Sequence, residues 1–145
     1  MFDVKQEDEP DLRSEQECFP DIDPGVEVVG DRVLVQLRRE KTTSKGGIIL
    51  VDETKQTLRF NETVAKVVQI GPLAYKNLDD LQPWIEGPWC KVGDLVRTIK
   101  YGGDRFVVNP DDGGAPVVFI TLQAREIISK IKSFEYAQKM RAFVD

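Results

Sequence analysis

The chain has 145 residues, of which 41% are hydrophobic, and a formal net charge of −5, so we expect one ordinary soluble domain with a real core. No stretch approaches the roughly 20 continuous apolar residues of a membrane helix and no secretory signal opens the chain, so we expect a cytoplasmic protein without membrane contact. The two cysteines fit a reducing compartment, and the lack of histidine excludes His-based catalytic triads and most zinc sites.

Residues 1–25 are strongly acidic, with nine acidic and two basic residues, whereas the rest of the chain is close to neutral. We predict an N-terminal acidic extension that is disordered or loosely draped over the body, with Phe2, Val4, Phe19 and Ile22 as possible attachment points. A solvated tail is the preferred interpretation, and an arm that contacts a partner is the alternative. Since the near-neutral remainder offers no concentrated basic face, we expect no nucleic acid partner.

The sequence predicts the first strand over residues 26–37. Val33, Val35 and Leu37 recur at every second position, which is the pattern of a strand with one buried face. A polar connection of about 25 residues follows at 38–62, and connections of that length in a compact domain are usually functional or disordered.

Five residues make this connection a candidate binding site. Gly46 and Gly47 permit a turn, and the large aliphatic residues Ile48, Ile49 and Leu50 follow it directly. Aliphatic side chains in a polar connection are costly unless something covers them, so we expect a partner to do so. The alternative is that they form an ordinary buried strand.

The segment after a predicted strand at 63–70 is harder to assign. Residues 72–90 contain two Pro-Trp pairs and suggest an irregular or partly helical excursion. Trp84 and Trp89 are more consistent with plugging the end of a barrel than with forming a docking surface.

Short strands separated by turn residues continue to the end of the domain, and they favour a small, partly open β-barrel. The predicted strands cover residues 94–100, 105–108, 116–121 and 127–132. In the last segment, 133–145, apolar residues at helical spacing predict a short amphipathic helix that packs on the body.

Nothing in the chain indicates catalysis. It lacks a phosphate-binding glycine loop, and its paired carboxylates, Asp79-Asp80 and Asp111-Asp112, fall in predicted loops. We therefore predict a protein that is not an enzyme and that needs neither a metal nor a cofactor.

Several segments, in one order, carry a family resemblance. They are Gly30-Asp31-Arg32-Val33-Leu34-Val35, Ser44-Lys45-Gly46-Gly47-Ile48-Ile49-Leu50, 64–71, Lys91-Val92-Gly93-Asp94-Leu95-Val96, 117–120 and 127–131. Together they resemble the GroES-type co-chaperonins of the chaperonin-10 family over roughly residues 28–132. Zinc-dependent alcohol dehydrogenases share this barrel, but they need metal-binding residues and a nucleotide domain that the sequence lacks.

The resemblance implies an all-β fold, a GroES-like small partly open β-barrel at 26–132. Within this domain it places a mobile loop at about 38–62 and a variable roof segment at about 72–90. The acidic extension at 1–25 precedes the domain, and the C-terminal helical extension at 133–145 follows it. Asp31 and Arg32 would lie near a subunit boundary, where the closing strand of one copy pairs with the first strand of its neighbour.

The implied function is that of a co-chaperonin, a ring-shaped lid and a heptamer. It would bind a large GroEL-like chaperonin in its nucleotide-bound state through Gly46, Gly47, Ile48, Ile49 and Leu50, and assist the folding of client proteins. The departures from the bacterial pattern suggest a phage-encoded member acting in the host cytoplasm on a viral capsid protein. The alternative is a GroES-like structural or interaction protein, such as a virion component, that binds no chaperonin.

Overall fold

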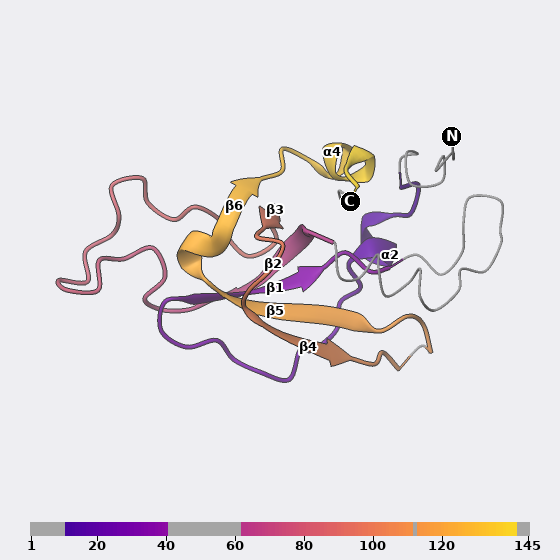
Figure 1. Cartoon of the computed structure of the whole chain (residues 1–145), viewed down its shortest axis with the longest axis horizontal. Coiled ribbons are helices and arrows are strands. Elements are labelled where there is room, and N and C mark those ends of the chain that lie inside the picture. Colours follow the sequence, from indigo (N-terminus) through magenta and orange to yellow (C-terminus); the bar gives the residue numbers. More distant parts are fainter. Residues whose placement is uncertain (1–10, 41–61, 112, 142–145) are drawn as a thin grey trace.

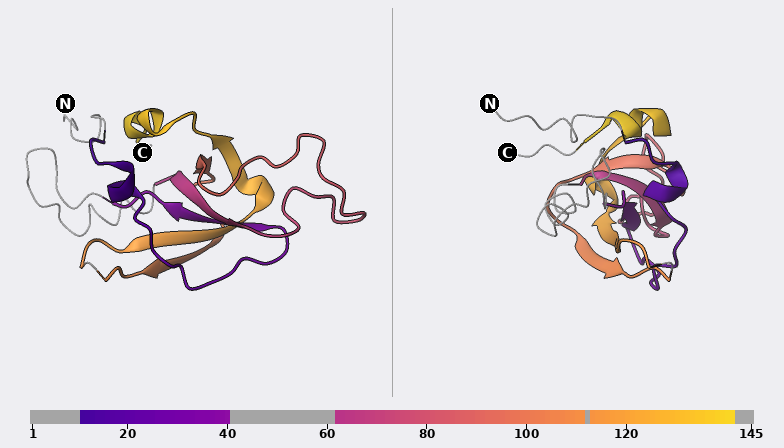
Figure 2. Two further views of the ribbon diagram at one scale, coloured as in Figure 1. Left: turned by 180° about the vertical axis from the view of Figure 1, so that it is seen from behind. Right: turned by 90° about the vertical axis from the view of Figure 1, so that its right-hand side faces the viewer.

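A computed structural model describes residues 11–40, 62–111 and 113–141 (Figure 1). Within them, one antiparallel sheet of six strands has the order β4-β5-β1-β2-β3-β6. The strands are β1 (Arg32–Leu37), β2 (Val64–Ile70), β3 (Leu95–Thr98), β4 (Asp104–Val108), β5 (Val117–Gln123) and β6 (Ile127–Lys130). The sheet curls around its interior (Figure 2), and since β4 and β6 end the order without pairing with each other, the barrel is partly open. The predicted all-β fold is confirmed.

The central strand β1 is buried on both faces, and it pairs with β2 on one side and β5 on the other. As the alternation predicts, Val33, Val35 and Leu37 share one face and belong to the main hydrophobic core. Leu34 points the other way and packs with Phe119 in a second cluster. The first strand begins at Arg32 rather than at residue 26.

The N-terminal segment differs most from expectation. Instead of draping loosely, residues 11–20 pack against the barrel, and Cys18 and Phe19 are only 0% and 2% exposed. The short helix α2 (Glu15–Cys18) begins with a capping box in which the Ser14 side chain accepts from the Glu17 backbone N–H and the Glu17 side chain accepts from the Ser14 N–H. Phe19 is one of the four predicted attachment points, and Ile22 packs partly against a second cluster, whereas Phe2 and Val4 lie outside the described residues. The burial of Cys18 was not predicted. The domain boundary at residue 25 stays a prediction.

The excursion at 72–90 is irregular and contains no helix, so the partly helical alternative is wrong. Its two arms are joined by a bridge between Lys76 and Pro83, and it projects from the end of the barrel opposite α2 (Figure 1). At its base Tyr75 meets Trp84 and Trp89, with ring centroids 5.4 and 5.7 Å away. Both tryptophans are partly buried and pack against the main core, as expected for side chains that close the end of the barrel.

The C-terminal segment forms the predicted helix over a shorter range, as α4 (Phe134–Lys139). A short 3-10 turn, η1 (Ala124–Glu126), separates β5 from β6. The helix α4 buries Ala137, and Phe134 packs partly against the same cluster, so it packs on the body as expected. Among the residues that the structure describes, no helix is long and apolar enough to cross a membrane.

Candidate functional site

The five predicted contact residues, Gly46, Gly47, Ile48, Ile49 and Leu50, lie outside the described residues. The structure does describe both ends of the segment that contains them. Leu37 pairs with Ala65 at the end of the β1–β2 ladder, and the backbone N–H of Arg38 donates to the carbonyl of Val64 at 2.9 Å. The two stems of the segment, residues 38–40 and 62–64, therefore leave the barrel side by side.

A buried ion pair joins these two stems. The Arg38 guanidinium donates to the Glu62 carboxylate through Nε (2.6 Å to Oε1) and Nη2 (3.1 Å to Oε2). The two side chains are only 6% and 12% exposed, and buried charges of this kind are stable only when they are paired and hydrogen-bonded. Glu62 Oε2 completes its bonding with the backbone N–H groups of Thr63 and Val64, at 3.1 and 3.2 Å.

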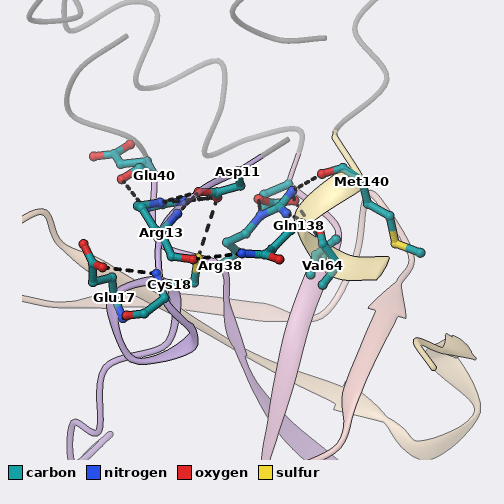
Figure 3. A network of polar contacts seen from close by, with 12 residues as sticks. Asp11, Arg13, Glu17, Cys18, Arg38, Glu40, Val64, Gln138 and Met140 are labelled. Carbon is teal, nitrogen blue, oxygen red and sulfur yellow. Dashed lines mark hydrogen bonds and ion pairs between the residues drawn. The ribbon is translucent and has the colours of Figure 1, made fainter. Parts of the chain in front are cut away.

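The same guanidinium also holds the C-terminal helix. Its Nη1 donates to the carbonyl of Ala137 and its Nη2 to the carbonyl of Met140, each at 2.8 Å (Figure 3). The Ala137 carbonyl already accepts from the Met140 backbone N–H at 3.1 Å, so Arg38 adds a second donor to it. The Met140 carbonyl lies just beyond the last helical turn, where carbonyls lack a partner within the helix, and Arg38 supplies a donor to it. One side chain thus connects the first stem, the second stem and the end of α4.

The N-terminal segment contacts the first stem from another side (Figure 3). The backbone N–H of Arg39 donates to the carbonyl of Cys18 at 2.8 Å, and Arg13 Nη1 donates to the carbonyl of Glu40 at 3.3 Å. Arg13 is itself held by the carboxylate of Asp11, with Nη2 2.7 Å from Oδ2. Although burial lowers the pKa of Arg13, the bond to Asp11 and nearby negative groups raise it above its ordinary value on balance.

The titratable groups of this region are placed for anchoring rather than for chemistry. Burial raises the pKa of the Cys18 thiol to about 12, and a thiol that stays protonated is a poor nucleophile. At the opposite end of the barrel, burial also raises the pKa of Tyr75 and of Cys90. Over the described ranges, no three Cys, Asp or Glu side chains are grouped to hold a metal ion. The fold and the described contacts together define a β-barrel domain that holds the two ends of a long connection side by side.

Comparison with known proteins names the family. The family described as the Chaperonin 10 Kd subunit matches residues 25–131. The chain is 30% identical over 109 residues to the co-chaperonin GroES of Chlamydia pneumoniae, an overlap of 74% of this chain and 91% of that protein. It is also 30% identical over 102 residues to the co-chaperonin GroES of Corynebacterium jeikeium, covering 70% and 89% of the two chains. A third co-chaperonin GroES, from Lactobacillus acidophilus, is 36% identical over 75 residues, 52% of this chain and 71% of that one.

The chain therefore belongs to the chaperonin-10 family, as its sequence resemblance indicated. This family is non-enzymatic, in agreement with the prediction that the protein is not an enzyme.

The structure revises where a neighbouring copy can pair. Because β1 already has β2 and β5 on its two sides, the strand that starts at Arg32 cannot accept a strand from another copy. Only the preceding part of the predicted first strand, residues 26–31, lies outside the described sheet, and the Gln69 side chain bonds the backbone of Val26 and Val28 there. In the described sheet, the open edges are β4 and β6.

Sequence reasoning missed Arg38 and Glu62, because both were assigned to the polar connection. A usable signal was present, since residues of opposite charge immediately follow the first predicted strand and precede the second. Antiparallel neighbours place such positions beside each other.

Proposed function

We propose that this protein is a co-chaperonin, a ring-shaped lid that binds a large GroEL-like chaperonin in its nucleotide-bound state and assists the folding of client proteins in the cytoplasm. The observation that supports the proposal most strongly is the match of residues 25–131 to the chaperonin 10 Kd subunit. The contact would be made by Ile48, Ile49 and Leu50, presented by Gly46 and Gly47.

The expected energetics favour many weak contacts over one strong one. Burying each of the three aliphatic side chains would yield roughly 1.5–3 kcal/mol. Ordering about ten residues of the connection would cost on the order of 10 kcal/mol or more. One connection alone should therefore bind weakly, whereas several copies on a ring turn later contacts into intramolecular ones. Weak single contacts also let the chaperonin control release, because only a difference in affinity between its states can shift the equilibrium.

We also propose that the ring is a heptamer whose copies meet along the β6 edge. Ile128 on β6 is 60% exposed in the isolated chain, and an uncovered sheet edge is a ready pairing surface. The segments beyond the family match, before residue 25 and after residue 131, support a secondary proposal of a phage-encoded protein with a capsid protein as client. Co-expression of such a capsid protein, with and without this chain, tests that secondary proposal through the yield of soluble capsid protein.

Co-sedimentation with a purified GroEL-type chaperonin, with and without nucleotide, tests the main proposal. We expect nucleotide-dependent binding that Ile49→Asp abolishes. The control Thr57→Asp adds the same charge to the same connection away from the three aliphatics, and it should bind like the wild type. If the wild type binds neither a bacterial nor a phage chaperonin, the co-chaperonin proposal fails and the alternative of a structural component that uses this barrel is favoured.

A further inference from the structure

Residues 11–13 of the N-terminal segment and the C-terminal helix α4 meet near the stems of the predicted binding segment. The backbone N–H of Asp11 donates to the carbonyl of Gln138 at 2.7 Å, and Gln138 Nε2 donates to the carbonyl of Arg13 at 3.4 Å. Both contacting segments lie outside residues 25–131, the part that matches the family. This chain has therefore added structure to both sides of one functional region.

A separate hydrophobic cluster supports these added segments. Cys18 and Phe19 from the N-terminal segment and Ala137 from α4 pack with Val64 and Leu95 of the barrel. Since Val64 belongs to the second stem, the packing of the added segments and the position of that stem depend on the same buried contacts. The added segments are thus part of the stem structure rather than independent appendages.

Arg38 connects this packing to both stems. Its guanidinium donates to Glu62, to the carbonyl of Ala137 and to the carbonyl of Met140, and its own backbone N–H donates to Val64. We propose that Arg38 is a positioning residue that couples the docking of α4 and the N-terminal segment to the order of the two stems, and thereby strengthens chaperonin binding. The role in binding rests on the proposed function.

The physical basis is preorganisation. A binding segment whose stems are already fixed does not lose their conformational freedom when the partner binds, so more of the contact free energy appears as affinity. By linkage, anything that loosens α4 should loosen the stems, and the reverse should also hold.

The variant Arg38→Lys tests the coupling with its charge retained. A lysine ammonium cannot make the two-point contact to Glu62 while also reaching two carbonyls, because its donors radiate from one nitrogen. The matched control is Arg105→Lys, since Arg105 is half-buried and donates to the carbonyl of Lys100 at 2.8 Å from the edge strand β4. We expect chaperonin binding to weaken at least about tenfold for Arg38→Lys, the effect of one lost charge-assisted hydrogen bond, and to stay unchanged for the control.

Amide hydrogen exchange on the free full-length chain separates this inference from the proposed function. In Arg38→Lys, exchange should accelerate together at Arg39 in the first stem and at Met140 after α4, whereas the central amides of β1 keep wild-type protection. Phe134→Ala removes packing at the first residue of α4 and leaves the Arg38 side chain unchanged, and it should accelerate exchange at Arg39 as well. This second variant also serves if Arg38→Lys does not fold.

Each outcome decides the inference. Acceleration at Met140 without acceleration at Arg39 would overturn the coupling, and joint acceleration with undiminished chaperonin binding would overturn the positioning role. If the wild type itself fails to bind, the proposed function falls and the role in binding falls with it. In that case joint acceleration of amide exchange at Arg39 and Met140 still supports the coupling, and acceleration at only one of the two amides refutes it.

Discussion

Arg38 and Glu62 are 24 residues apart in the chain, yet the guanidinium of one faces the carboxylate of the other through contacts of 2.6 and 3.1 Å. Both side chains are largely withdrawn from solvent. Removing one member of such a pair leaves a buried charge without its partner, which is far more costly than the loss of a surface ion pair.

We therefore expect Glu62→Ala to lower the free energy of unfolding by about 3–5 kcal/mol, measured by urea denaturation. The double variant Arg38→Met with Glu62→Met should be less destabilised than the sum of its single changes, because neither charge is then left alone. Glu15→Ala is the control. The ion pair between Glu15 and Lys66 is exposed, so its loss should lower the free energy of unfolding by less than about 1 kcal/mol. Equal losses for Glu62→Ala and Glu15→Ala would contradict a buried role for the Arg38–Glu62 pair.

Phe19 tests whether the N-terminal segment is part of the folded domain. It is 2% exposed and packs in the cluster that includes Val64 and Leu95, so Phe19→Ala should reduce the free energy of unfolding by about 3–5 kcal/mol. Leu12 in the same segment is 84% exposed, so Leu12→Ala should change the free energy of unfolding by no more than about 0.5 kcal/mol. If the segment were held loosely, urea denaturation would instead show equally small changes in the free energy of unfolding for both variants.

The sequence predicted the strands well because alternation and turn residues are local signals. Val33, Val35 and Leu37 revealed the buried face of β1 without any knowledge of its partners. Gln36 shows the limit of this reasoning. Alternation along β1 puts this polar side chain on the face opposite Val33, Val35 and Leu37, yet it is buried, and the carbonyl of Pro20 accepts from its amide at 2.9 Å.

The roles of the added segments could not be predicted either, because their contacts join residues that are far apart in the sequence. The interaction of Arg38 with Ala137 spans 99 residues, and no periodicity in either segment encodes it. The five predicted contact residues at 46–50 came from the family resemblance and from uncovered aliphatic side chains in a polar connection. Their role in binding is still a prediction.

Gly71 marks a close approach between two backbone segments. A Cβ at this position would lie 2.4 Å from the carbonyl oxygen of Gly30 and 2.8 Å from that of Arg32. Because both obstacles are backbone atoms, Gly71→Ala should cost more than about 2 kcal/mol of unfolding free energy, measured by urea denaturation. Gly25→Ala is the comparison, because a Cβ there would meet no atom and only the φ of +77° opposes the change. We expect it to lower the free energy of unfolding by about 1–2 kcal/mol. A smaller loss at Gly71 than at Gly25 would show that the two segments separate easily.

Cys18 should make the protein less stable in alkali. Burial is the main cause that raises its pKa from 9.0 to about 12 in the folded chain. Between these two pH values the unfolded chain has released the thiol proton and the folded chain has kept it. The contribution of Cys18 to stability is therefore complete below pH 9, and it is lost as the pH rises toward 12, by about 1.4 kcal/mol per pH unit.

The variant Cys18→Ala isolates this contribution, because the buried Tyr75 and Cys90 titrate in both proteins and cancel in the comparison. We expect the free-energy difference between wild type and variant, from urea denaturation at several pH values, to be constant from pH 7 to 8.5 and to decline above pH 9. The variant also loses the contact between the Cys18 Sγ and Asp11, but that loss is independent of pH in this range and only offsets the curve. Parallel curves up to pH 10.5 would mean that the Cys18 thiol ionises as readily in the folded chain as in the unfolded one, and that the N-terminal segment does not keep it from water.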